Sequence, residues 1–83
     1  MTNKSKEKVF LGFETVARIA CILQEGMMLE KNVVKDLKEI ELVETVDDED
    51  GKTYLVLSEE YLQKLPEEAG RALKNFIELD DLN

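Results

Sequence analysis

The stretch "IELVETVDDEDGKTYLVLSEE", residues 40–60, decides the fold of this chain. Between Ile40 and Val46 the apolar residues recur with a period close to two, which is the spacing of a strand. Four consecutive acids and Gly51 follow, and the chain then becomes rich in the strand formers Thr, Tyr, Val and Leu. Two such segments around a short Asp-Gly loop predict a β-hairpin.

The register of this hairpin has two solutions. Either Asp50 and Gly51 form a two-residue turn, or a longer loop places Gly51 in the left-handed conformation, and the two choices pair different residues across the strands. A two-stranded ribbon is marginally stable by itself. We therefore expect the hairpin to pack on helices.

The chain before the hairpin carries two helical patterns. From Phe13 to Leu23 the apolar residues form a wide stripe at helical spacing, which predicts a helix that is covered on more than one side and ends at Gly26. We expect Met27 and Met28 to fill the core, with an adaptable binding surface as the alternative. Residues 29–38 predict a short amphipathic helix, or a shorter one that is capped by Asn32.

The chain after the hairpin is also helical by pattern. Ser58 is a favoured N-cap residue, and Pro66 predicts a break followed by a new helix. Gly70 weakens this last helix by about 1 kcal/mol relative to alanine, unless close packing requires it. The apolar residues expected on one face of the last helix are Ala69, Ala72, Leu73, Phe76 and Ile77.

These elements predict a small single-domain α+β protein with the order helix, helix, β-hairpin, helix. A chain of 83 residues can bury one modest core. We expect a flexible basic tail over residues 1–9, the globular domain over residues 10–79, and a frayed acidic C-terminus over residues 80–83.

The composition argues against an enzyme. Histidine is absent and Cys21 is the single cysteine, which rules out a histidine-based triad, an ordinary zinc site and an internal disulfide. Cys21 lies among apolar residues and is expected to act as a small buried hydrophobe. No glycine-rich phosphate loop or nucleophile motif is present, so we expect no catalytic residues and no cofactor.

The acidic run does not fit a calcium loop. When Gly51 is placed at the sixth position of an EF-hand loop, Val46 and Leu57 fall at the first and twelfth positions, where carboxylate ligands belong. We therefore expect no metal site at this loop.

The charge is distributed unevenly. Residues 1–38 carry seven Lys or Arg against five acids, whereas residues 39–83 carry four against fourteen, and the net charge is −8. Phosphate would be repelled by the larger part of the chain, so we expect no direct binding to nucleic acid. No apolar stretch is long enough to span a bilayer, and we expect a cytoplasmic protein without membrane contact.

The acids themselves are the candidate site. We expect a negative face that docks on a basic protein, such as a nucleic-acid-binding protein whose phosphate site the acids would occupy. Small acidic inhibitors encoded by phages and mobile elements resemble this arrangement. The alternatives are acids that serve only solubility and a homodimer formed through an apolar face that the last helix leaves uncovered. The residues expected in the negative face are Asp47, Asp48, Glu49, Asp50, Glu41, Glu44, Glu59 and Glu60.

The segment "VVKDLKEIELVETVDDEDGKTYLVLSEE" resembles the end of a winged helix-turn-helix domain, in which a helix leads directly into a two-stranded wing and then another helix. The likeness covers residues 29–65 and implies a reduced winged-helix arrangement. Four acids stand where a DNA-binding wing carries Arg or Lys. The resemblance therefore implies a regulatory role through protein contact.

Overall fold

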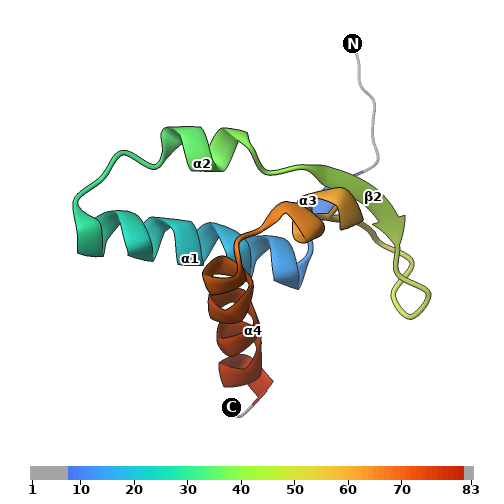
Figure 1. Ribbon diagram of the computed structural model, residues 1–83. Helices are drawn as coiled ribbons and strands as arrows, with labels where there is room; N and C mark the ends of the chain where they lie inside the picture. Colours follow the sequence, from blue (N-terminus) through green and yellow to red (C-terminus); the bar gives the residue numbers. More distant parts are fainter. Residues whose placement is uncertain (1–7, 82–83) are drawn as a thin grey trace.

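The computed structural model describes residues 8–81 (Figure 1) and confirms an α+β fold. The predicted tail and C-terminus fall partly on residues 1–7 and 82–83, which lie outside the described residues. The elements are β1 (Val9–Leu11), α1 (Phe13–Leu29), α2 (Val34–Lys38), β2 (Leu42–Val46), β3 (Thr53–Leu57), α3 (Glu59–Lys64) and α4 (Glu67–Asp81).

The predicted hairpin is confirmed, and its register is settled. Strands β2 and β3 are antiparallel, with Leu42 opposite Leu57 at one end and Val46 opposite Thr53 at the other. Six residues connect the strands, and Gly51 has a φ of 71°. The longer loop is thus the correct alternative, because it uses glycine at the left-handed position.

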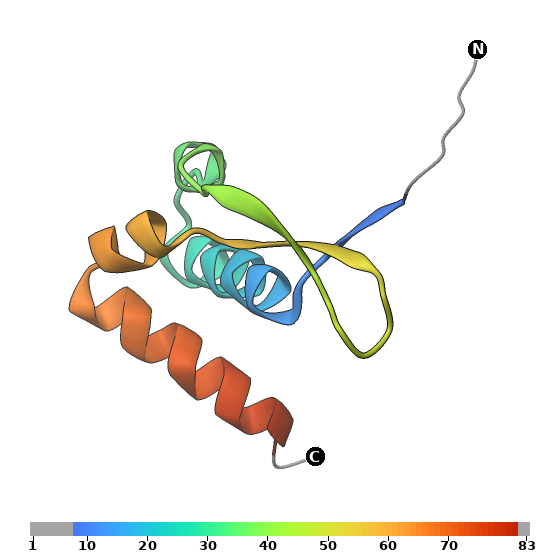
Figure 2. The ribbon, with the colours of Figure 1, turned by 90° about the vertical axis from the view of Figure 1, so that its right-hand side faces the viewer.

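A third strand was not predicted. β1 pairs in parallel with β3, so the sheet order is β1-β3-β2 and β3 is central. Figure 2 shows β1, in blue, beside the hairpin. Val9, which we had assigned to the tail, is in register with Thr53. Three residues are too few to show an alternating pattern, and the pairing joins segments far apart in sequence.

Helix α1 continues past its predicted end. Gly26 is buried inside the helix, and a Cβ added there would lie 2.4 Å from Cγ1 of Val33. The glycine therefore allows the following segment to fold back closely against the helix. The helix ends instead at Glu30, which has a φ of 54° and donates its N–H to the carbonyl of Gly26.

Two other predictions near this end have different outcomes. Met27 and Met28 were expected in the core, but they are 79% and 75% exposed, because they lie near the end of α1 on sides that its neighbouring elements leave open. The shorter version of the second helix is confirmed, since α2 begins at Val34. Its N-cap residue is Val33 rather than Asn32, although the Asn32 side chain accepts the N–H of Val34 at 2.8 Å.

The core lies where α1, β3, α3 and α4 meet. Its buried members are Ala17, Leu57, Tyr61 and Leu73, and half-buried residues of α4 pack around them. Figure 1 shows α4 crossing α1 at a steep angle. The buried Thr15 hydroxyl donates to the carbonyl of Leu55 at 2.8 Å and fixes α1 to the sheet.

The predicted helix boundaries after the hairpin are confirmed. The Ser58 hydroxyl accepts the N–H of Tyr61 at 3.1 Å and caps α3. Leu65, the residue before Pro66, is extended, as expected for a residue that precedes proline, and α4 starts at Glu67.

Candidate protein-interaction surface

The acidic loop between β2 and β3 is held by its own hydrogen bonds. The N–H of Asp47 donates to the carbonyl of Lys52 at 2.9 Å, and the N–H of Gly51 donates to the carbonyl of Asp47 at 2.8 Å. The Asp47 carboxylate accepts the N–H of Glu49 at 2.7 Å. The loop therefore has a defined shape, although it lies at the tip of the hairpin, away from the helices (Figure 1).

Asp50 is the most strongly engaged acid of the loop. One of its oxygens accepts the N–H of Lys52 at 2.8 Å, and the other accepts the hydroxyl of Tyr54 at 2.6 Å. The bond from Tyr54, followed by that from Lys52, lowers the pKa of Asp50, and the same bond raises the pKa of Tyr54. Asp47 and Asp50 thus shape the loop.

The other two acids of the loop have a different position. Asp48 and Glu49 are exposed, and in the described part of the chain neither carboxylate takes part in an ion pair or a side-chain hydrogen bond. The loop that carries them is ordered by its neighbours. These two carboxylates are therefore available to a partner, and the backbone that carries them is held in one shape.

The remaining predicted acids lie at the base and in the middle of the hairpin and at the start of α3. At its base, one oxygen of Glu41 accepts the Ser58 hydroxyl at 3.1 Å and the other lies 3.4 Å from Nζ of Lys64. Glu59 and Glu60 are exposed in the first turn of α3, next to this base.

The eight acids consequently form two groups with Glu44 between them. Glu44 lies in the middle of β2, opposite Leu55. The five residues of β2 separate the base from the tip, and a strand of that length spans about 17 Å. The tip and the base are thus separate acidic groups at the two ends of the hairpin.

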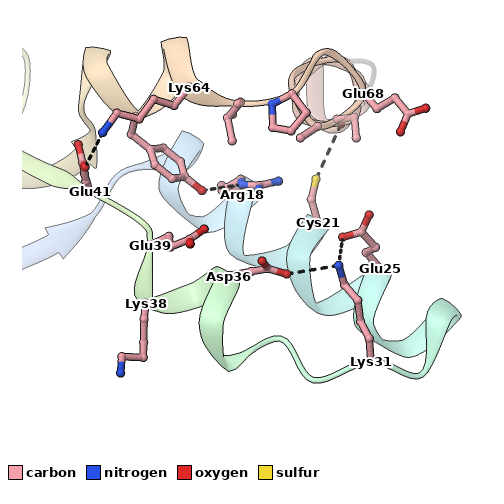
Figure 3. A pocket seen from close by; sticks show the side chains of 15 residues that line it. Arg18, Cys21, Glu25, Lys31, Asp36, Lys38, Glu39, Glu41, Lys64 and Glu68 are labelled. Carbon is pink, nitrogen blue, oxygen red and sulfur yellow. Dashed lines mark hydrogen bonds and ion pairs between the residues drawn. The ribbon is translucent and has the colours of Figure 1, made fainter.

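Sequence reasoning missed a polar groove between α1, α2 and the start of α4. It has a volume of about 750 Å³, and Figure 3 shows Arg18, Cys21 and Glu25 of α1 projecting toward it. The groove is formed by segments that are distant in sequence, so no local sequence pattern predicts it. Burial raises the pKa of the Cys21 thiol, which the Arg18 charge partly offsets, and the thiol donates to the carbonyl of Ala72 at 3.8 Å.

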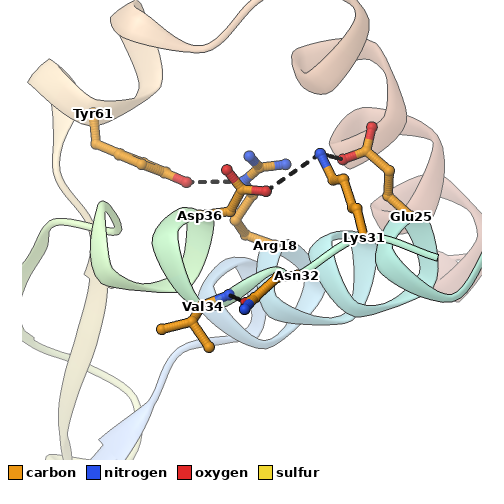
Figure 4. Close-up of polar contacts among 7 residues, drawn as sticks. All are labelled: Arg18, Glu25, Lys31, Asn32, Val34, Asp36 and Tyr61. Carbon is orange, nitrogen blue, oxygen red and sulfur yellow. Dashed lines mark hydrogen bonds and ion pairs between the residues drawn. The ribbon is translucent and has the colours of Figure 1, made fainter. Parts of the chain in front are cut away.

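The charges in this groove are largely compensated (Figure 4). Nζ of Lys31 lies 3.2 Å from Glu25 and 3.4 Å from Asp36, and the bond to Glu25 is the main reason that the pKa of Lys31 is raised. The Nε–H of Arg18 donates to the Tyr61 hydroxyl at 2.9 Å. These contacts link helices and leave the groove without a strong preference for one charge.

Two further findings concern the described residues alone. No group of three or more His, Cys, Asp or Glu side chains is placed to hold a metal ion. None of the helices over residues 8–81 has the length and apolar character needed to cross a membrane.

Comparison of the chain with family models, with curated proteins and with solved structures gave no match. The order α2, β2, β3, α3 agrees with the order on which the winged-helix resemblance rests. However, the sheet also contains β1, which comes before α1 and is parallel to β3. The resemblance to winged-helix domains is therefore limited to the order of these four elements along the chain.

Proposed function

We propose that this chain is a non-enzymatic, cytoplasmic protein-interaction module whose acidic hairpin tip docks on a basic surface of another protein. The observation that carries the proposal is the pair Asp48 and Glu49, exposed on a loop that internal hydrogen bonds hold in shape. Because the backbone of the loop is already ordered, it loses little conformational entropy when the acids bind a partner.

The net charge of the chain indicates what kind of partner it binds. The whole chain carries a net charge of −8, which accelerates the encounter with a positively charged surface. A phosphate-binding surface of a nucleic-acid-binding protein is such a surface, and the two carboxylates would occupy the place of phosphate oxygens. The module would then regulate its partner by competing with nucleic acid, as acidic inhibitors from phages and mobile elements do.

The test uses the double variant Asp48→Asn with Glu49→Gln, which removes two charges and keeps the shape of the loop. The full chain is used as bait in cells that encode it, and bound proteins are eluted with a salt gradient. We expect a basic protein that elutes at low salt and whose binding the double variant weakens by about tenfold or more. Binding should also fall when short DNA is added as a competitor.

The matched control is Glu68→Gln with Glu78→Gln, which removes the same charge from exposed positions of α4. This control should retain nearly full binding, because the effect is local to the tip. If both double variants bind the partner equally well, the tip is not the docking site and the proposal fails. The variant Glu59→Gln with Glu60→Gln shows whether the base of the hairpin also contributes.

A further inference from the structure

Helix α1 carries an apolar stripe that the described chain covers only in part. Phe13, Val16 and Leu23 are 45–46% exposed and Met27 is 79% exposed, whereas Ala20 is half-buried. These five residues follow one another at intervals of three, four, three and four positions. This is the spacing that places side chains along one seam between two packed helices.

The charged residues of α1 lie on its other side. The helix has three charged residues, Glu14, Arg18 and Glu25, and Figure 4 shows the last two directed toward the polar contacts with α2 and α3. The positions that flank the stripe are uncharged: Ala17 and Gln24 on one side, Ile19 and Gly26 on the other. An exposed helix normally presents its charges to water and its apolar residues to the core, and α1 presents the stripe to water.

The stripe is continuous with a shallow apolar groove at the end of α1. Gln24 and Met28 line this groove together with Phe76 and Leu79 of α4, and its volume is about 450 Å³. Large side chains carry on the order of 150–250 Å² each, so the exposed parts of the stripe, Met28 and Leu79 amount to on the order of 600 Å². A standard interface buries about 800 Å² per partner. Two such patches together bury on the order of 1,200 Å², which is the lower end of the standard range and fits a weak dimer.

We infer that this stripe is the interface of a homodimer in which the α1 helices of two copies pack antiparallel about a two-fold axis at Ala20. In this arrangement Ala20 meets its own copy and allows close approach. Phe13 and Met27 lie seven residues on either side of Ala20, so Phe13 of one copy faces Met27 of the other. An aromatic ring and a thioether sulfur make favourable contacts.

The middle of the stripe is also nearly symmetric. Val16 lies four residues before Ala20 and Leu23 three residues after it, so in the antiparallel pair their heights differ by about 1.5 Å, the rise of one residue. A two-fold interface requires one patch to be complementary to itself, and the stripe is suited to this because its smallest residue, Ala20, lies at the centre with larger apolar side chains on both sides. This self-complementarity is the reason for choosing a second copy over an unrelated partner.

One other feature favours the same occupant, and the position of the charges limits the effect that opposes it. Residues 8–79 bury five hydrophobic side chains, namely Ala17, Ile22, Leu57, Tyr61 and Leu73, which is a small core, and oligomerisation is a common supplement for small domains. Since α1 brings no charge to the flanks of the seam, the −8 charge of each copy opposes pairing only from a distance. The proposed dimer does not depend on the docking of the acidic tip, and it is an interaction additional to the proposed function.

The first test measures the mass of the full chain by sedimentation over a range of concentrations. We expect a monomer–dimer equilibrium with a dissociation constant on the order of 1–100 μM. Leu23→Lys should weaken the dimer by at least about tenfold, because a charge is placed at the centre of an apolar interface. A chain that stays monomeric at about 1 mM would overturn the inference.

The matched control is Val34→Lys on α2. Val34 is 56% exposed and lies outside the stripe, and the change in net charge is the same. It should leave the dimer intact, and equal weakening by Leu23→Lys and Val34→Lys would show that another surface pairs. Should Leu23→Lys fail to fold by circular dichroism, Met27→Lys replaces it, because that side chain is nearly free of contacts.

The second test addresses the antiparallel geometry. Ala20→Cys in a Cys21→Ser background should form a disulfide-linked dimer on mild oxidation, since the two-fold axis brings the two copies of position 20 together. Val34→Cys in the same background should not. If Leu23→Lys disrupts the dimer but Ala20→Cys does not cross-link, the antiparallel arrangement about Ala20 is wrong.

Discussion

At the scale of single residues, Ser58 joins the base of the hairpin to α3. Its N–H donates to the carbonyl of Glu41 at 2.9 Å, its hydroxyl oxygen accepts the N–H of Tyr61, and the hydroxyl also contacts the Glu41 carboxylate. The residue is 4% exposed. One side chain thus both caps α3 and fixes the base of the sheet.

We predict that Ser58→Ala lowers the free energy of unfolding by about 1–2 kcal/mol, because the cap of α3 is lost and a buried N–H is left without a partner. Urea denaturation followed by circular dichroism measures the change. Ser58→Thr retains the hydroxyl and should cost less than Ser58→Ala. Equal stability of Ser58→Ala and the wild type would show that the cap contributes nothing.

The bond between Tyr54 and Asp50 makes the hairpin tip sensitive to pH. The pKa of Asp50 is below its ordinary value of 3.8 in the folded chain, so the stability that this group contributes is present above 3.8 and is lost as the pH falls through the lowered pKa. The pKa of Tyr54 is above its ordinary value of 10.0, so its contribution is present below 10.0 and is lost as the pH rises through the raised pKa.

We predict that Tyr54→Phe moves the pKa of Asp50 back toward 3.8, because the largest cause of the shift is removed while the backbone bond from Lys52 remains. Titration of the Asp50 carboxyl carbon by NMR measures this pKa. Tyr61→Phe, the same substitution away from the tip, should leave the pKa of Asp50 unchanged. A pKa that does not move in Tyr54→Phe would contradict the assigned hydrogen bond.

At the scale of elements, two helical glycines have opposite roles. A Cβ at Gly26 would meet Val33 and approach the carbonyl of Lys31 at 3.4 Å, whereas a Cβ at Gly70 would find open space. Gly26 thus permits the close approach of two segments. Gly70 has no such packing role. Close packing, which would have explained a glycine inside this helix, is absent around it.

We predict that Gly26→Ala destabilises the chain by about 1–3 kcal/mol through overpacking, and that Gly70→Ala stabilises it by about 0.5–1 kcal/mol through helix propensity. Both are measured by urea denaturation. The two variants control for each other, because they make the same substitution inside a helix. A common sign for the two effects would show that the environment of Gly26 is not as tight as described.

The helices and strands also show which features local sequence patterns can predict. The hairpin, the cap at Ser58 and the break at Pro66 were predicted because each is coded by neighbouring residues. β1 was missed because its pairing with β3 is decided more than forty positions away, Val9 against Thr53. The end of α1 was misplaced because a glycine that stops a helix and a glycine that permits close contact look the same in sequence.

At the scale of the whole molecule, the two proposed interactions respond to salt in opposite directions. Docking of the acidic tip relies on attraction between opposite charges, which salt screens. The dimer joins two copies that each carry −8, and its seam on α1 is apolar. Salt screens their mutual repulsion and leaves apolar association intact.

We predict that raising the salt concentration from about 0.05 to 0.5 M weakens partner binding and strengthens the dimer. Sedimentation measures the dimer, and a binding titration with the identified partner measures docking. A dimer that dissociates as salt rises would be held by ion pairs, which contradicts the apolar seam. Partner binding that persists at high salt would contradict docking through the tip.

The candidate site was also predicted only in part from the sequence. The sequence located the acids, but it did not show that Asp47 and Asp50 are used within the loop while Asp48 and Glu49 point outward. Nor did it separate the tip from the base of the hairpin. These distinctions depend on which hydrogen bonds close the loop and on the length of β2.

The sequence by itself determined the hairpin, the helical segments, the helix boundaries around Ser58 and Pro66, and the excess of acids, since these follow from neighbouring residues and composition. Only the tertiary structure decided that β1 completes the sheet, that Gly26 lies inside α1, and that Met27 is exposed. The physical reason lies in α1, which is apolar around most of its surface. Periodicity shows that such a helix must be covered, but the arrangement of the other elements decides which side remains open.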